Sequence, residues 1–405
     1  MAAARSAMAS ASSAAASAPA EVPAARPGLK ARLAGVWPVG ELTGWLGASG
    51  FGSHSTASEV LRDVPLQARV FIVTGGNAGL GYAAAKALAC TGATVIIACR
   101  SPERGAAAAT ELSIAAAEKG GSVAAMQCDL SSAASVRAFA AAFLATGQPL
   151  HGLICNGAPH AAGWLRAVAW VAADARAAFA AGVLPAPFCR TADGHEQLWQ
   201  VNYLSHALLC NLLLPALERS ATEPGAARIV LVSSIVHHFG YAGGIRWGAV
   251  DEERGYVAWK AYSQSKLALL LHARALDITL AARGSLVVAH AVHPGAVQTS
   301  GAVAAEAHSG NAGACLSCLG GRFHRSAEQG AASIVFAAAS PALRRGRGGF
   351  VCNANRADGH ASKLARDPLA AFRLFDMAHE QMAADARAAM DDADALPASV
   401  LAVVD

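Results

Sequence analysis

Charged and aromatic side chains are scarce in this 405-residue sequence, at 15% and 6% of the residues. The net charge of +4 is too weak to argue for a nucleic-acid partner. The longest uncharged run of the second half, residues 201–217, contains Asn, His and Pro, and it is more typical of a buried helix than of a membrane span. Hydrophobic residues reach 54%, and a chain of this length can bury a large core.

Nine cysteines are scattered along the chain, mostly within apolar runs. This spread favours buried thiols in a reducing compartment over a disulfide framework. Cys315 and Cys318 form one close pair, but a zinc site would need a second pair. We therefore expect no metal site, and a redox role for this pair stays open.

The first 35 residues are rich in alanine and serine, and they contain no acidic residue before Glu21. This composition is typical of an organelle transit peptide and lacks the apolar region of a secretory signal. A disordered tail of low complexity is the alternative. Residues 36–66, with Trp37 and Trp45, are expected to pack on the body as a lead-in segment.

From residue 67 the sequence alternates between short apolar, β-branched runs and longer helical patterns. Strands are predicted within 68–76, 93–100, 122–129, 150–156, 227–234 and 286–295. Helices are predicted near 79–92, 102–118, 132–146, 195–220 and 259–283. This alternation predicts an α/β fold, a single Rossmann-type domain over 67–360 with a doubly wound parallel sheet and helices on both faces. Residues 361–405 are expected to form a C-terminal helical extension.

A glycine-rich turn, TGGNAGLG at residues 74–81, places Gly75, Gly79 and Gly81 between a predicted strand and a predicted helix. Glycines there let the backbone approach a pyrophosphate at the helix N-terminus, so the turn predicts a dinucleotide site. The next strand ends at Arg100, where NAD-binding folds place an acid for the ribose. A guanidinium suits a 2′-phosphate instead, so NADP(H) is the predicted cofactor. A cap on the strand edge is the alternative role of Arg100.

Tyr262 and Lys266 lie four residues apart in the stretch AWKAYSQSK. On a helix this spacing puts the phenol and the ammonium on one face. Because an ammonium favours a nearby phenolate, we expect a lowered pKa for Tyr262 and a role in proton transfer. An incidental pair on a surface helix is the alternative.

These motifs occur in one order with Asp129 in CDL, Asn156 in ICNGA, Asn202 in VNYLSH, VSS at 232–234 and HPGAVQT at 293–299. Over residues 66–355 the sequence resembles the short-chain dehydrogenase/reductases. Within that superfamily it is similar to the branch of retinol dehydrogenases, protochlorophyllide reductase and WW-domain oxidoreductase. The stretches GASGFGSHSTASEVL and HHFGYAGGIRW look most like the plastid members associated with the inner-envelope protein translocon.

The resemblance implies a catalytic set of Asn202, Ser234, Tyr262 and Lys266. Tyr262 would exchange a proton with the substrate oxygen, to which Ser234 would also bond. Lys266 would lower the pKa of the phenol and hold the nicotinamide ribose, while Asn202 would position a water.

The resemblance also implies a set of cofactor contacts. Asp129 would meet the adenine, Asn156 the adenine-side ribose and Thr299 the carboxamide. The full set of implied NADP(H) contacts is Gly75, Asn77, Gly79, Leu80, Gly81, Arg100, Asp129, Leu130, Asn156, Tyr262, Lys266, Pro294, Gly295, Val297 and Thr299.

Two features depart from the family pattern. The usual NNAG is here Cys155 to Ala158, so one asparagine is kept. Residues 159–193 form an insert that is longer than the family needs and that includes an amphipathic stretch from Trp164 to Phe179. This insert could cap a large apolar substrate, dock on a membrane or partner, or rest on the body as an ordinary helix.

The complete catalytic set favours an NADP-dependent oxidoreductase acting on a small apolar carbonyl or alcohol substrate. One alternative is an NADP(H)-binding, redox-sensing module at a plastid membrane or translocon, and another is a C=C reductase of the protochlorophyllide reductase type. The resemblance and the N-terminal composition favour the chloroplast, with the cytoplasm as the alternative. Peripheral membrane or translocon contact and a homodimer are further expectations.

Overall fold

The computed structural model describes residues 46–158, 187–297, 325–344 and 346–394. Within these residues, eight strands form one sheet in the order β3-β2-β1-β4-β5-β6-β7-β8. Neighbouring strands are parallel except β7 and β8, which are antiparallel. The strands are β1 (Val70–Thr74), β2 (Thr94–Cys99), β3 (Ser122–Gln127), β4 (Gly152–Cys155), β5 (Arg228–Val232), β6 (Val288–His293), β7 (Phe350–Cys352) and β8 (Asn355–Arg356).

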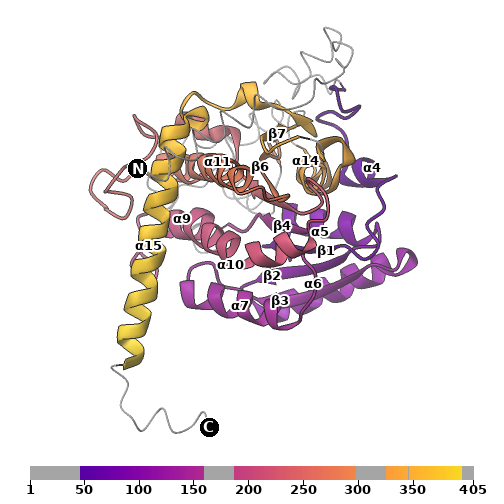
Figure 1. Cartoon of the computed structure of the whole chain (residues 1–405), viewed down its shortest axis with the longest axis horizontal. Coiled ribbons are helices and arrows are strands. Elements are labelled where there is room, and N and C mark those ends of the chain that lie inside the picture. The colour runs from indigo at the N-terminus through magenta and orange to yellow at the C-terminus, as the bar shows by residue number, and fades with distance from the viewer. Residues whose placement is uncertain (1–45, 159–186, 298–324, 345, 395–405) are drawn as a thin grey trace, which may run out of the picture.

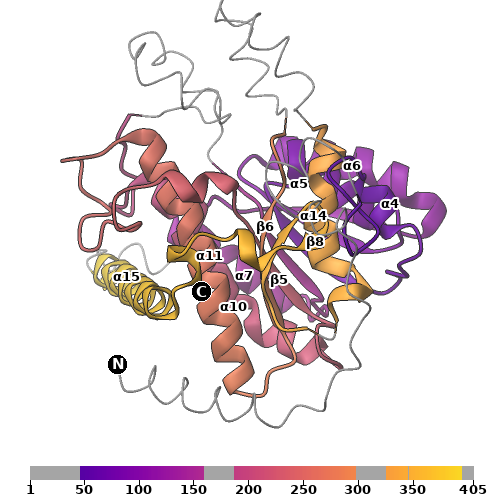
Figure 2. The same ribbon diagram turned by 90° about the horizontal axis from the view of Figure 1, so that it is seen from above.

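Helices cover both faces of the sheet (Figure 1, Figure 2). One face carries α4 (Ala57–Leu61), α5 (Gly79–Ala89), α6 (Pro102–Ala116) and α14 (Ala327–Ala339). The other face carries α7 (Ala133–Ala145), α10 (Ser205–Ser220) and α11 (Ala258–Ala282). Shorter elements are η1 (Ala117–Lys119), α9 (Gln197–Trp199), the π-helical turn η4 (Gln200–Leu204), and the 3₁₀ turns η5 (Ile235–Phe239), η6 (Pro341–Leu343), η7 (Asp358–His360) and η8 (Leu364–Arg366).

The core lies in two layers because successive side chains of a strand point to opposite faces. Phe71 and Val73 of β1 pack into the core under α5 and α14. Val70 and Ile72 pack into the core under α10 and α11. All five residues of β1 are buried, as expected for a strand covered on both faces. The predicted doubly wound parallel sheet is therefore confirmed.

The described part of the lead-in segment, residues 46–66, packs on the body. Helix α4 lies against α14, and the Phe51 and Phe336 rings meet edge to face with centroids 6.3 Å apart. A capping box starts α4, because Thr56 Oγ1 accepts from the N–H of Glu59, and the Glu59 carboxylate accepts from the N–H of Thr56.

The last helix, α15 (Pro368–Asp394), lies along α11, and its C-terminal end extends beyond the other helices (Figure 1). Its buried face includes Phe372, Leu374 and Met382. Its polar contacts to the body include those from Arg137 Nη2 to Met382 O at 3.2 Å and from His195 Nε2 to Asp385 Oδ1 at 3.0 Å. In the described part of the chain, no helix combines the length and the apolar character that a bilayer crossing requires.

The strand order fixes where a site can form. Chain order reverses between β1 and β4, which places a topological switch point at the carboxyl ends of these strands. Because β1, β4, β5 and β6 are parallel neighbours, the residues that follow them share one edge of the sheet. Those residues include Gly75, Asn156, Ser234 and Pro294.

Candidate active site at the carboxyl edge of the sheet

The glycine-rich turn after β1 has the backbone that only glycine adopts readily. Gly75 and Gly79 have φ angles of +63° and +55°. A Cβ added to Gly81 would lie 2.4 Å from Gly75 O, whereas a Cβ added to Gly79 would meet nothing within 4 Å. Helix α5 starts at Gly79, and its N-cap is Ala78, whose side chain cannot accept a hydrogen bond. The turn therefore leaves open space in front of N–H groups of a helix N-terminus, which fits a pyrophosphate.

Three other predicted contact residues, Asn77, Leu80 and Val297, lie in or beside this turn. A Cβ added to Gly330 of α14 would come within 2.4 Å of Val297 Cγ2 and 2.6 Å of Leu80 Cδ2. The side chains of Leu80 and Val297 therefore both lie against Gly330, although the two residues follow different strands. Asn77 is half-buried in the turn itself.

Thr74 joins the ends of β1 and β4. Its Oγ1 accepts from the N–H groups of Asn156 and Gly157, both at 2.8 Å. Asn156 Nδ2 donates to Thr74 O at 3.1 Å. A Cβ added to Gly157 would lie 2.5 Å from Leu130 Cδ1, so Leu130 closes this corner. Asn156 therefore lies at the glycine-rich turn and Leu130 beside Gly157, and their predicted contacts to the cofactor stay predictions.

The buried side chain of His206 links Thr74 to Asn202. Because Asn202 O can only accept, the His206 proton lies on Nδ1, and Nε2 accepts from Thr74 Oγ1 at 2.9 Å, closer than the 3.4 Å from this hydroxyl to Ile154 O. His206 Nδ1 then donates to Asn202 O at 2.8 Å. Burial lowers the pKa of His206 to about 4, so the neutral imidazole fits this chain of bonds.

The side chain of Asn202 is held against α11. Nδ2 of Asn202 donates to Ser265 Oγ at 2.9 Å, and Ser265 Oγ donates to Tyr262 O at 2.7 Å. Asn202 lies in the π-helical turn η4, a deviation that often marks functional sites. Its Oδ1 is buried and has no hydrogen-bond partner among the described residues. The predicted role of positioning a water stays a prediction.

Tyr262 and Lys266 share one face of α11 as predicted, with Lys266 Nζ 5.5 Å from the centroid of the Tyr262 ring. Lys266 is only 5% exposed, and its Nζ donates to Val232 O at 2.9 Å. Burial lowers the pKa of Lys266 to about 8. Burial also raises the pKa of Tyr262 to about 12. The predicted fall in the pKa of Tyr262 is therefore wrong for this structure, because removal of the phenol from water sets the direction of the shift.

Ser234 is the second residue after β5 and the N-cap of η5. Its Oγ accepts weakly from the N–H of Val236 at 3.4 Å, and its side chain is partly exposed. His237 Nδ1 donates to Ser234 O at 2.7 Å, and His237 Nε2 accepts from the N–H of Ser362 at 3.1 Å. Burial lowers the pKa of His237 to about 4, which keeps the ring neutral for both bonds. Helix α11 packs against η5, and Ser233 Oγ donates to Lys266 O at 2.7 Å, which joins the residue before Ser234 to the helix that carries Tyr262.

Arg100 follows β2 at the same edge and is exposed. Gly75 N–H donates to Ala98 O at 2.8 Å, which places the end of β2 directly beside the glycine-rich turn. Asp129, after β3, has its Oδ1 engaged by the N–H and the hydroxyl of Ser131 at 2.9 and 2.7 Å. Arg100 thus follows a strand end beside the turn, and the predicted contacts of Arg100 and Asp129 to the cofactor stay predictions.

The segment after β6 completes the edge. Gly295 has a φ of +90°, and a Cβ there would lie 2.4 Å from Arg325 Cζ. Pro294 O accepts from Arg325 Nη1 at 3.1 Å. Thr299, the predicted carboxamide contact, lies outside the described residues. So do Cys315, Cys318 and residues 159–186 of the insert.

Sequence reasoning missed Thr74, His206 and His237. Thr74 stands first in the stretch TGGNAGLG, and His206 follows Asn202 by one helical turn in VNYLSH. A histidine one helical turn after a predicted catalytic residue, in an apolar stretch, was the sequence signal that could have predicted the role of His206. Among the described residues, no cluster of three or more His, Cys, Asp or Glu side chains could hold a metal ion.

The sheet order, the glycine-rich turn and the Tyr–Lys helix together define a Rossmann-type dehydrogenase site. A model of the short chain dehydrogenase family matches residues 69–309. The chain belongs to this family of oxidoreductases, whose fold binds a nicotinamide cofactor.

Comparison with individual proteins gives the branch. The chain is 35% identical over 338 residues to the chloroplastic short-chain dehydrogenase TIC 32 A of Brassica napus, covering 83% of this chain and 96% of that protein. It is 35% identical over 322 residues to human retinol dehydrogenase 12, covering 78% and 87%. Among solved structures, the RhlG/NADP active-site complex of Pseudomonas aeruginosa has a TM-score of 0.51 at 25% identity, covering 74% and 98%. The predicted branch is confirmed.

Proposed function

We propose that this chain is an NADPH-dependent oxidoreductase that interconverts an apolar carbonyl compound and its alcohol. The observation that carries the proposal is the 2.9 Å bond from the buried Lys266 Nζ to Val232 O. It fixes the Tyr262–Lys266 face of α11 to the end of β5, two residues before Ser234. We propose that the phenol of Tyr262, the ammonium of Lys266 and the hydroxyl of Ser234 act together at the edge of the sheet that also carries the glycine-rich turn.

The chain's own residues then divide the proton chemistry. The nicotinamide, when bound, supplies the hydride in reduction and takes it back in oxidation. Tyr262 Oη gives a proton to the substrate oxygen and becomes a phenolate, which the Lys266 ammonium stabilises. Ser234 Oγ donates a hydrogen bond to the same oxygen. A pKa of about 12 keeps the Tyr262 phenol protonated at neutral pH, which suits an acid in the reductive direction.

The proposed cofactor is NADP(H), held with the 2′-phosphate at Arg100. The exposed guanidinium follows β2, next to the turn that would hold the pyrophosphate. The similarity to an NADP-bound structure supports this choice. Asp129, Asn156 and Thr299 are proposed for the adenine, its ribose and the carboxamide. An apolar substrate is proposed because relatives include retinol dehydrogenase 12 and a polyprenol dehydrogenase.

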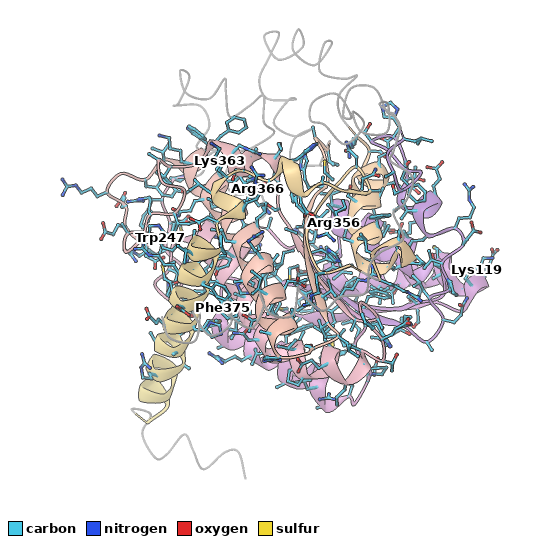
Figure 3. All side chains as sticks on the ribbon, turned by 45° about the horizontal axis from the view of Figure 1, so that its top comes forward. Lys119, Trp247, Arg356, Lys363, Arg366 and Phe375 are labelled. Atoms are coloured by element: carbon cyan, nitrogen blue, oxygen red, sulfur yellow. The ribbon has the colours of Figure 1, made fainter. Side chains whose placement is uncertain are left out.

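The test combines a cofactor titration with a substrate screen. NADPH should bind about tenfold or more tightly than NADH, the value of one charge-assisted contact. Arg100→Asp should narrow or reverse this preference. Lys119→Asp, the same charge change in η1 beyond the far end of α6, is the matched control and should leave this preference unchanged (Figure 3). Equal affinities for NADPH and NADH in the unmodified protein would remove Arg100 from the site.

The screen should offer NADPH with retinal-like aldehydes, steroids, quinones and protochlorophyllide. Consumption of NADPH with an aldehyde or ketone supports carbonyl reduction. Consumption with protochlorophyllide alone would favour the C=C reductase instead.

A second candidate is an NADP(H)-binding sensor in the plastid. The observation that favours it is the 35% identity to a chloroplastic protein over 83% of this chain. With it we propose a plastid location and contact with a membrane or translocon, as the resemblance of residues 47–61 suggests. Import into isolated plastids with removal of the N-terminal tail supports this location, and failure to import favours a cytoplasmic protein.

A further inference from the structure

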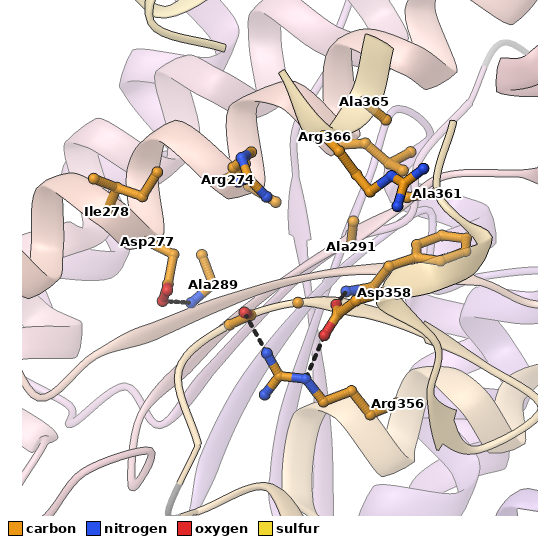
Figure 4. A pocket seen from close by; sticks show the side chains of 15 residues that line it. Arg274, Asp277, Ile278, Ala289, Ala291, Arg356, Asp358, Ala361, Ala365 and Arg366 are labelled. Carbon is orange, nitrogen blue, oxygen red and sulfur yellow. Dashed lines mark hydrogen bonds and ion pairs between the residues drawn. The ribbon is translucent and has the colours of Figure 1, made fainter. Parts of the chain in front are cut away.

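A cavity of about 280 Å³ lies between α11, β6, β7 and the segment from Arg356 to Arg366 (Figure 4). It is separate from the proposed active site, because it adjoins α11 from Leu270 onward and opens between the helix and the outer strands. Small side chains create the space, and they come from the helix, from β6 and from the segment before α15. They are Ala273, Ala289, Ala291, Ala361 and Ala365.

The two carboxylates that line the cavity are already neutralised. Asp277 pairs with Arg347, Nη2 to Oδ1, at 3.0 Å and accepts from the N–H of Ala289. Asp358 pairs with Arg356 at 2.5 Å and accepts from the N–H of Phe350 at 2.7 Å (Figure 4). Neither carboxylate is left to bind a cation.

Two arginines that line the cavity have no such partner. Arg274 comes from α11 and Arg366 from η8, and both are exposed (Figure 4). Within the described ranges, neither guanidinium makes an ion pair or a side-chain hydrogen bond. The cavity therefore joins an apolar, alanine-lined surface to an excess of positive charge.

The walls are fixed before any ligand arrives. The N–H of Ser362 donates to His237 Nε2 at 3.1 Å, and the N–H of Arg366 donates to Ser362 O at 3.1 Å. Arg356 Nη1 also donates to Arg347 O at 2.9 Å. A preformed concave site with a few polar groups is the usual form of a small-molecule site.

We propose that this cavity binds a small amphiphilic anion. Its oxyanion head, a carboxylate or a phosphate, contacts Arg274 and Arg366, whose planar guanidinium groups suit such heads. Its short apolar body lies on the alanine surface and leaves water there. The proposal is independent of the dehydrogenase chemistry at the other site.

The experiment is calorimetric titration of the full-length protein at low ionic strength, where charge effects are least screened. Octanoate and octyl phosphate should bind to one site, and the tighter of the two identifies the head group. Inorganic phosphate, which lacks the apolar body, and 1-octanol, which lacks the charge, should bind at least about tenfold more weakly.

Variants of the two arginines test whether the anion binds in this cavity. Arg274→Ala and Arg366→Ala should each weaken octanoate or octyl phosphate by about tenfold, the value of one charge-assisted contact. Lys363→Ala is the matched control, since it removes a neighbouring exposed charge that does not line the cavity (Figure 3). It should change the affinity little, and NADPH affinity should be unchanged in all three variants. Absence of saturable binding, equal binding of 1-octanol, or equal losses in Lys363→Ala and the arginine variants would overturn the proposal.

Discussion

Replacement of Lys266 by methionine should remove an energetic cost that the folded protein carries for its active site. The ordinary pKa of the lysine is 10.5, and burial lowers it to about 8, a difference of about 2.5. At about 1.4 kcal/mol for each unit, the buried ammonium costs on the order of 3 kcal/mol of unfolding free energy at neutral pH. Methionine keeps most of the length of the side chain without the charge.

Part of the stability that Lys266→Met gains by removing this charge is offset by a lost hydrogen bond. The 2.9 Å hydrogen bond from Lys266 Nζ to Val232 O is lost, and the carbonyl is left without that donor, at a cost of about 1–3 kcal/mol. The net change at neutral pH should therefore range from near zero to a stabilisation of about 2 kcal/mol. The pH dependence is the sharper measure, because the lost hydrogen bond affects it less.

The direction of this pH dependence follows from the lowered pKa of Lys266. A lysine whose folded-state pKa lies below its unfolded value binds fewer protons when folded, so the cost is fully present below about pH 8 and is gone above about pH 10.5. The advantage of Lys266→Met over the unmodified protein should therefore shrink by about 3 kcal/mol between these limits. Urea unfolding of both proteins at a series of pH values measures it.

Lys86→Met, at an exposed position on α5, is the matched control and should show little change with pH. A Lys266→Met advantage that stays constant from neutral to alkaline pH would refute the reasoning. Such a result would mean that Lys266 is not a buried ammonium in the folded protein.

Three further outcomes follow from the geometry. Gly81→Ala should weaken NADPH binding more than tenfold in a fluorescence titration, because its Cβ would lie 2.4 Å from a backbone oxygen. Gly79→Ala should cost only about 1 kcal/mol of backbone strain. Equal effects of the two variants would contradict the turn geometry. His206→Phe should lower the free energy of unfolding by about 1–3 kcal/mol, since Thr74 Oγ1 and Asn202 O each lose a buried hydrogen bond. An unchanged value in urea unfolding would contradict the assigned bonds. His195 has a pKa raised to about 9 by its carboxylate partners against desolvation, so the stability that it contributes is present below about pH 6.5 and is lost as the pH rises through 9. Asp385→Asn should flatten this pH dependence and increase hydrogen exchange in α15; the same pH dependence in variant and parent would contradict the ion pair.

The fold was largely predictable because its strands and helices carry strong local patterns. The predicted helix over 259–283 is observed at Ala258–Ala282, and the strand within 93–100 at Thr94–Cys99. Helix α14 escaped prediction because Ala327–Ala339 is buried nearly all round and is rich in alanine, so it shows no polar face. Strand β7 is only three residues long and gives too short a pattern.

The site was predictable where a motif names its residues and not where tertiary structure sets their properties. The helical spacing of Tyr262 and Lys266 placed them together. Their pKa values depend on burial by β5 and η5, elements that are far away in the sequence, so the direction of the Tyr262 shift was predicted wrongly. The bonds of His206 to Thr74 and Asn202 join three separate elements, and only the i, i+4 part of them is local.

The central claim is that Tyr262 transfers the proton, and one comparison tests it most directly. Turnover and NADPH affinity should be measured for Tyr262→Phe on the best substrate of the screen. Turnover should fall by about 10²–10⁴, the contribution of a placed acid or base, while NADPH affinity changes by less than about twofold. Tyr256→Phe, a tyrosine whose hydroxyl instead donates to Glu196 Oε1 at 3.4 Å, should keep its turnover. Unchanged turnover in Tyr262→Phe would contradict the enzyme at this site and leave the NADP(H)-binding sensor as the better account.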